Sequence, residues 1–285
     1  MQASPVKPPR IFLLLIAFSL LIGLFALVNE WLTGSAVPLQ QKNIPAFTLV
    51  LDDPLKTLPN YSNIAHIPSR KDAFFKALLP LALYENERIS WQREQLTVIK
   101  QRLDLGEELD AKALTSIMGI AEYYGLEWPL DAKDWVVLER RVHQVPVDLV
   151  LMQAANESAW GTSRFAREGN NLFGQWCFTK GCGLVPAGRD EGKSHEVKKF
   201  ATILESVQAY MNNINTHRAY TQLRELREEL YEAGKEVGGV DLAPGLISYS
   251  ERRQAYVDEL IDMMNSNAKY VDHAMQEVGL PFLNQ

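Results

Sequence analysis

Apolar residues recur at intervals of three and four from about Arg70 onward, which is the spacing of helices that bury one face. This periodicity predicts a mainly helical chain. A first helix is expected to begin near Arg70, and a last one can be capped by Ser248 or Ser250. Between them, the pattern predicts helices over residues 111–124, 133–143, 203–217 and 218–236.

One more helix is expected to open at Pro146, because proline is favoured in a first helical turn. Its apolar stripe continues into a single carboxylate. The positions that share this face are Val147, Val150, Leu151, Ala154 and Glu157. Gly161 is expected to end the helix, and Thr162 or Ser163 can cap a short helix after it.

Glycine and proline interrupt short alternating segments between residues 174 and 200. Such a composition is typical of turns that join short strands. We therefore expect a small β-hairpin lobe at about residues 174–200, within a mainly α (α+β) domain that covers residues 69–285. A cleft is expected between the helices and this lobe.

Residues 11–28 form an uncharged apolar run that follows Lys7 and Arg10 and precedes Glu30. As a helix, the run would be about 27 Å long, close to the roughly 30 Å hydrocarbon core of a bilayer. The basic flank predicts that residues 1–10 stay in the cytoplasm and that the remainder is exported. The interpretation is a single-pass inner-membrane protein with its folded domain in the periplasm.

Cleavage by a signal peptidase is the alternative, because Gly34, Ser35 and Ala36 are small residues of the kind that such an enzyme accepts. It would release the protein into the periplasm. The apolar run is longer than that of a typical cleaved signal, which favours an uncleaved anchor. Residues 29–68 contain five prolines and predict an extended linker between the anchor and the domain.

The net charge of −6 argues against nucleic-acid binding, which depends on clustered basic residues. The five histidines are scattered and neither a CxxC nor an HExxH motif occurs, so no metal or cofactor is expected. Cys177 and Cys182 enclose four residues. In an exported chain they can form a disulfide across the lobe, and two free thiols are the alternative.

Glu157 is the first candidate for catalytic chemistry. A carboxylate that continues a buried stripe should lie against the core or on a cleft wall. Loss of solvent there raises its pKa toward the range that a general acid needs. A glutamate on a solvated helix face is the alternative.

Residues 153–175 read QAANESAWGTSRFAREGNNLFGQ. This segment resembles the motif of the bacterial endo-β-N-acetylglucosaminidase family, which reads A-x-x-E-S-x-W-G-x-S, then a spacer, then N-N-L-F-G. Members of that family cut the glycan strands of peptidoglycan and include the flagellar muramidase domain. The whole chain, with its anchor and cysteine loop, is most similar to the Bax subgroup. The resemblance implies a lysozyme-like fold, peptidoglycan glycan strands as substrate and partner, and Glu157 as the general acid.

Glycosidic cleavage also requires something that stabilises or captures the positively charged sugar. Glu196, in the strand-like segment 195–200, resembles the glutamate of a His-Glu-Val sequence in the Bax subgroup. Glu191, in a turn of the lobe, is the alternative, and either residue can instead be an exposed hairpin charge. The N-acetyl oxygen of the substrate can also take this role.

Tyr249 matches a tyrosine that lines the family's cleft near the acid, in a segment like Y-A-T-D-P-x-Y, and Tyr256 matches the second tyrosine. The chain departs from this pattern, because residues 251–253 read E-R-R and the Asp-Pro pair is missing. The resemblance implies that Tyr249 contacts the N-acetyl group or holds the acid in place. Simple packing is the alternative.

Trp160, Phe173 and Trp176 are candidates for contact with sugar rings. Of these, Phe173 fits the core better and Trp176 fits an exposed platform. Asn170 and Asn171 tolerate left-handed backbone and are expected to serve the turn, with contact to the acetamide as a second role.

Two other functions compete with hydrolysis. Lytic transglycosylases share a Glu-Ser pair at a helix end, but they continue with a segment like G-A-x-G-L-M-Q where this chain has N-N-L-F-G-Q. A noncatalytic glycan-binding protein on the same architecture is the third hypothesis.

Overall fold

The computed structural model describes residues 47, 49–51, 53–189, 192 and 194–278, which all belong to one compact unit spanning residues 44–285. The predicted cytoplasmic segment 1–10, the anchor 11–28 and residues 29–46, 48 and 52 of the linker lie outside the described residues. Within the part that is described, no helix has both the length and the apolar character needed to cross a bilayer.

The described elements are mostly helical, which confirms the prediction of a mainly α domain. In chain order they are η1 (Tyr61–Asn63), α2 (Ile67–Asp104), α3 (Ala111–Tyr123), α4 (Ala132–Arg141), α5 (Val147–Ser158), α6 (Arg164–Gly169), β1 (Trp176–Cys177), β2 (Gly183–Leu184), β3 (Glu196–Lys198), α7 (Ile203–Thr216), η2 (Arg218–Tyr220), α8 (Thr221–Glu232), α9 (Gly239–Leu242), η3 (Ala243–Leu246) and α10 (Gln254–Glu277).

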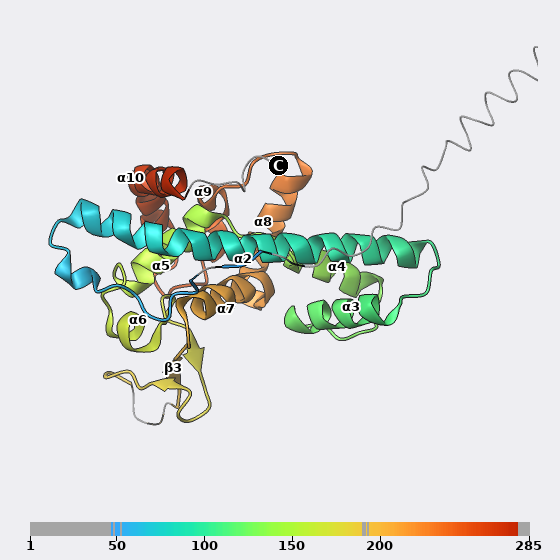
Figure 1. Ribbon diagram of the computed structural model, residues 1–285, viewed down its shortest axis with the longest axis horizontal. Helices are drawn as coiled ribbons and strands as arrows, with labels where there is room; N and C mark the ends of the chain where they lie inside the picture. The colour runs from blue at the N-terminus through green and yellow to red at the C-terminus, as the bar shows by residue number, and fades with distance from the viewer. Residues whose placement is uncertain (1–46, 48, 52, 190–191, 193, 279–285) are drawn as a thin grey trace, which may run out of the picture. The chain divides into compact units, whose positions relative to one another are not determined.

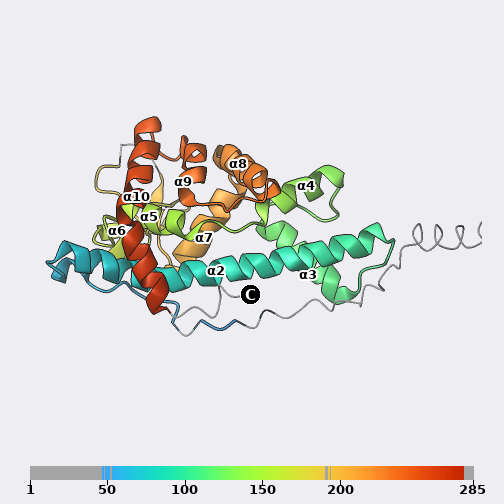
Figure 2. The same cartoon turned by 90° about the horizontal axis from the view of Figure 1, so that it is seen from above.

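Helix α2 is the longest described element, and several of the other helices pack along it (Figures 1 and 2). It contacts α5, α7 and α10 as well as α3. The buried residues of α2 include Phe74, Phe75, Leu78 and Leu79, which form part of one core that extends through α5, α7 and α10. This arrangement places α5 in the interior, where its last residues can present a side chain to a buried environment.

Helix α5 ends at Ser158, three residues before the end that the sequence predicted at Gly161. Ala159 and Trp160 adopt left-handed backbone, with φ of 51° and 57°. The Ser158 hydroxyl explains this early end, because it donates to the Ala154 carbonyl (2.6 Å) and accepts from the Gly161 amide (2.8 Å). The short helix α6 is capped by Ser163, one of the two residues predicted for that role.

Two other predicted helix boundaries are also wrong. The helix expected over residues 218–236 is split, because the 3₁₀ turn η2 precedes the shorter helix α8. Neither Ser248 nor Ser250 caps the last helix, since α10 begins after Arg253, which has a φ of 52°. The Ser250 hydroxyl instead accepts from the Arg252 amide (3.3 Å), and this bond shapes the turn before α10.

The β-lobe predicted at about residues 174–200 is present, and its strands form a three-stranded antiparallel sheet in the order β1-β3-β2. Trp176 pairs with Val197 and Leu184 pairs with the same residue from the other side. The central strand β3 comes last in the chain. The loop that connects the two edge strands begins after Cys177 of β1 and ends with Cys182. In Figure 1 this lobe extends from one side of the helical body.

Residues 53–66, which the sequence assigned to the linker, pack on the helical domain. The Leu55 and Pro54 carbonyls accept from the Ile203 (2.8 Å) and Leu204 (3.2 Å) amides at the start of α7. Tyr61 is 1% exposed and lies in the core. A side chain at Gly161 would come within 2.8 Å of the Tyr61 ring, so glycine is required at that crossing.

Candidate active site

Glu157 lies in the last turn of α5, with its carboxyl group half-buried. The Tyr256 hydroxyl donates to its Oε1 atom at 2.9 Å. Burial raises the pKa of Glu157, and the charge of Glu259 acts in the same direction, whereas the Tyr256 hydrogen bond and the charge of Arg252 oppose them. A carboxyl group in this environment holds its proton more tightly than an exposed one, which suits a proton donor.

Stacked aromatic side chains lie next to this acid and reach it through Tyr256. Tyr249 stacks on Tyr256 with ring centres 5.4 Å apart, and Phe173 stacks on Tyr210 of α7 at 4.0 Å. The Tyr249 hydroxyl donates to the Phe173 carbonyl at 3.1 Å. Tyr249 therefore connects the segment that leads into the lobe with the turn before α10. Its hydroxyl hydrogen is used in the bond to the Phe173 carbonyl.

Gln153 and Tyr210 belong to the same site, although the sequence analysis named neither. Gln153 is fully buried and its Nε2 donates to the Tyr256 hydroxyl at 2.8 Å, while the Tyr210 hydroxyl donates to its Oε1. A sequence signal for Gln153 existed, because it precedes Glu157 by four residues and falls on the same face of α5.

A groove of about 740 Å³ lies along α10. Arg252 pairs with Glu259 at 2.5 Å in this groove, and the charges of both residues act on the pKa of Glu157. Its lining residues are Arg252, Glu259, Asp262, Met263, Asn265 and Ser266. Hydroxyl, amide and charged groups of this kind can bind the hydroxyl and acetamide groups of a glycan.

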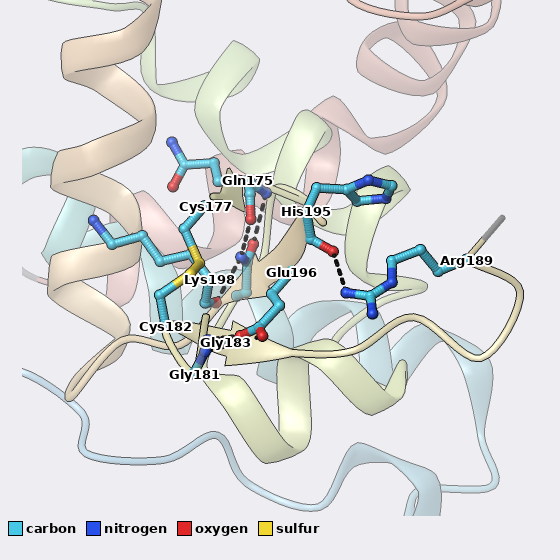
Figure 3. Close-up of a disulfide and its surroundings, with 10 residues drawn as sticks. Gln175, Cys177, Gly181, Cys182, Gly183, Arg189, His195, Glu196 and Lys198 are labelled. Carbon is cyan, nitrogen blue, oxygen red and sulfur yellow. Dashed lines mark hydrogen bonds between the residues drawn. A yellow bond between two sulfur atoms is a disulfide. The ribbon is translucent and has the colours of Figure 1, made fainter. Parts of the chain in front are cut away.

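Glu196 lies under the disulfide loop of the lobe (Figure 3). Its Oε1 accepts from the Gly181 amide (3.0 Å) and its Oε2 from the Gly183 amide (2.8 Å), and Cys177 and Cys182 form the disulfide beside them. These two backbone hydrogen bonds lower the pKa of Glu196, which is 5% exposed. Both oxygens are already engaged, and these contacts favour a structural role over that of a catalytic base.

Glu191, the alternative second carboxylate, lies outside the described residues. The two sulfur atoms and a carboxylate oxygen of Glu196 lie within 4.8 Å of one another, a spacing that would allow a metal ion. Cysteine binds metal as the thiolate, and the disulfide between Cys177 and Cys182 removes both thiolates. This cluster is therefore not a metal site in its oxidised form.

The two asparagines of the turn use their amides to fix the lobe to the helical domain. Asn170 has a φ of 53°, and its Nδ2 donates to the carbonyls of Lys56 (2.8 Å) and Phe200 (3.1 Å). Asn171 is 1% exposed and its Nδ2 donates to the Lys198 carbonyl of β3 at 2.9 Å. These contacts support the turn and leave the Nδ2 groups committed to the backbone.

The three aromatic candidates lie in different environments. Phe173 is 3% exposed and belongs to the core. Trp160 packs its ring against Phe74 and Phe75 of α2, with centres 5.8 and 5.3 Å away. Trp176 is 59% exposed on β1 and stacks on His195 at 4.2 Å. Of the three, Trp176 therefore offers the most open ring face for a sugar.

Replacing Glu196 with glutamine should loosen the disulfide loop without changing the helical domain. The neutral amide loses the charge-assisted part of two hydrogen bonds, and its NH₂ group cannot accept from an amide. Hydrogen–deuterium exchange should become faster at Gly181 and Gly183. The matched variant Glu168→Gln removes an exposed glutamate of α6 and should leave exchange in the loop unchanged. Equal exchange in E196Q and wild type would contradict the structural role.

The mainly helical domain, with a half-buried acid at the end of one helix and a small β-lobe beside it, has the arrangement of lysozyme-like proteins. Residues 133–269, from α4 into α10, match the Glucosaminidase family, described as mannosyl-glycoprotein endo-beta-N-acetylglucosaminidase. The matched region includes both Glu157 and Tyr256.

The chain is also 32% identical over 217 residues to Protein bax of Escherichia coli (strain K12), and this alignment covers 75% of the chain and 76% of that relative. The protein therefore belongs to the glucosaminidase family, as a Bax-like member. No solved structure matches the chain significantly.

Proposed function

We propose that the protein is an endo-β-N-acetylglucosaminidase that hydrolyses peptidoglycan glycan strands at the N-acetylglucosaminyl bond, with Glu157 as the general acid. The observation that carries this proposal is the environment of Glu157. Its carboxyl group is half-buried, one oxygen is held by Tyr256, and burial raises its pKa. Membership of the glucosaminidase family supports a glycan strand as the substrate.

In this reaction Glu157 donates its proton to the departing glycosidic oxygen while positive charge develops on the sugar. The N-acetyl oxygen of the substrate is the better-supported partner for that charge, because the loop amides already occupy both oxygens of Glu196. Glu191 on the lobe remains the alternative, as the base that activates a water molecule. Tyr249 supports the site through its stacking on Tyr256.

We further propose that residues 11–28 anchor the protein in the inner membrane, with its folded domain in the periplasm near its substrate. The apolar run and its basic flank carry this proposal. Release into the periplasm after cleavage near Ala36 is the alternative. N-terminal sequencing of the mature protein from membrane and soluble fractions distinguishes the two.

Digestion of purified sacculi by the full-length chain should release fragments with N-acetylglucosamine at their reducing ends. Mass spectrometry of the products, before and after borohydride reduction, identifies that end, because only a free reducing sugar gains two hydrogens. Products that end in an anhydro-sugar would show a lytic transglycosylase instead. Binding to sacculi without release of any fragment would show a noncatalytic glycan-binding protein.

A further inference from the structure

Tyr210 determines the direction of a hydrogen-bond chain that ends at Glu157. Tyr210 on α7 is 1% exposed, and its hydroxyl donates to Gln153 Oε1. A buried hydroxyl hydrogen without an acceptor is costly, by roughly 1–3 kcal/mol. This donation keeps the Oε1 atom of the Gln153 amide facing Tyr210.

The orientation of the Gln153 amide determines which group donates to the acid. Because its oxygen faces Tyr210, its Nε2 faces Tyr256 and donates to that hydroxyl at 2.8 Å. The oxygen of Tyr256 is therefore an acceptor, and its own hydrogen is left to donate to Glu157 Oε1 at 2.9 Å. The opposite direction would require Tyr210 to accept from the amide, which would take away the acceptor of its own hydroxyl.

We propose that Tyr210, Gln153 and Tyr256 form a positioning relay that reserves the Oε2 atom of Glu157 for the acidic proton. Oε1 receives the Tyr256 hydrogen. The carbonyl oxygen of a carboxylic acid accepts a hydrogen bond better than its hydroxyl oxygen does, so this bond favours Oε1 as the carbonyl oxygen. The proton therefore sits on Oε2 and passes from there to the glycosidic oxygen. No hydrogen in the relay has to move during this step. The proposal rests on the function proposed above and specifies how its acid is oriented.

The relay also stabilises the carboxylate form of Glu157, which is left after the proton has been transferred. When Glu157 becomes a carboxylate, the hydrogen bond from Tyr256 to Oε1 becomes charge-assisted and stronger. The preceding donations polarise the Tyr256 hydroxyl in the same sense. The stacking of Tyr249 on Tyr256 and of Phe173 on Tyr210 holds the rings in place, so this stabilisation requires no reorganisation.

The test uses the full-length chain with the variants Tyr210→Phe and Gln153→Met, each of which interrupts the relay without touching Glu157. Both should lower kcat for sacculus hydrolysis about three- to tenfold, the value of one net hydrogen bond, with KM unchanged. Because the Tyr256 hydrogen bond lowers the pKa of Glu157, a weaker bond should raise that pKa. The alkaline limb of the kcat profile should therefore move to higher pH.

Tyr124→Phe is the matched control. The Tyr124 hydroxyl donates to Gln92 Oε1 at 2.9 Å, which is also a buried tyrosine-to-glutamine bond, but it joins α3 to α2. The control should lose as much thermal stability as Tyr210→Phe, with kcat and the pH profile of the wild type. If the relay variants behave like this control, the relay is overturned while the proposed function stands.

A titration of the Glu157 carboxyl by ¹³C NMR separates this proposal from the function on which it rests. The pKa of Glu157 should be higher in Y210F and Q153M than in the wild type and in Y124F. An unchanged pKa overturns the relay even if the wild type hydrolyses sacculi. A raised pKa in a chain that shows no turnover supports the relay and rejects the proposed enzyme.

Discussion

Glu157→Gln should lower kcat for the release of reducing ends from sacculi by about 10²–10⁴-fold, the range of a general acid. Glutamine has the same shape as glutamate, and its Oε1 can still accept the Tyr256 hydrogen at the position that the carboxylate uses. Its amide has no proton that it can give to the departing oxygen. The variant should therefore fold normally and bind glycan, while cleavage of the glycosidic bond becomes slow.

Glu229→Gln, which removes an exposed glutamate on α8, is the matched control and should keep full activity. The circular dichroism spectrum of E157Q should match that of the wild type. Its thermal unfolding should occur at the wild-type temperature or above it, because the neutral amide removes the cost of burying a charge. If E157Q keeps more than a tenth of the activity, another group donates the proton. If azide or formate restores activity to E157Q, Glu157 instead acts as a base or nucleophile.

The sequence predicted those parts of the structure that depend on local pattern. The stripe from Val147 to Glu157 indicated both the helix and the half-buried position of its carboxylate, because helical spacing alone places these residues on one face. The start of α7 at Ile203 and the cap of α6 at Ser163 followed from equally local signals. In each case the residues that decide the outcome are within one or two turns of one another.

The features that the sequence did not predict depend on contacts between distant segments. The central position of β3 follows from pairing with strands 13 to 20 residues earlier, which no local pattern specifies. The hydrogen bonds from the loop amides to the Glu196 carboxylate follow from that pairing. The relay joins three helices through Gln153, Tyr210 and Tyr256. Local signals pointed to Gln153 and Tyr256 separately, but no local pattern shows that these side chains meet.

His143 is a second residue whose burial should have a large effect, in this case on how the unfolding free energy changes with pH. Burial lowers the pKa of His143 to about 3, and the charges of Arg227 and Arg93 act in the same direction. The backbone of Gln144 gives the smallest contribution, which opposes them. The ring packs edge-on against Tyr231 at 5.1 Å, in the region where α4 meets α8. The folded protein therefore keeps this ring neutral well below its ordinary pKa of 6.5.

The wild-type protein should lose stability on acidification because of this ring, and His143→Phe should remove that loss. As the pH falls through 6.5, the unfolded chain binds a proton at His143, whereas the folded chain does not until about pH 3. The wild type should lose about 2–3 kcal/mol of unfolding free energy relative to H143F between pH 6.5 and 4.5. Urea unfolding at both pH values measures this difference.

Burial raises the pKa of Glu157 and of Asp148, which has the opposite effect on stability, but the wild type and H143F share these effects, so they cancel. The control His66→Gln, at an exposed ring, should keep the wild-type loss, and equal pH dependence of H143F and wild type would contradict the prediction.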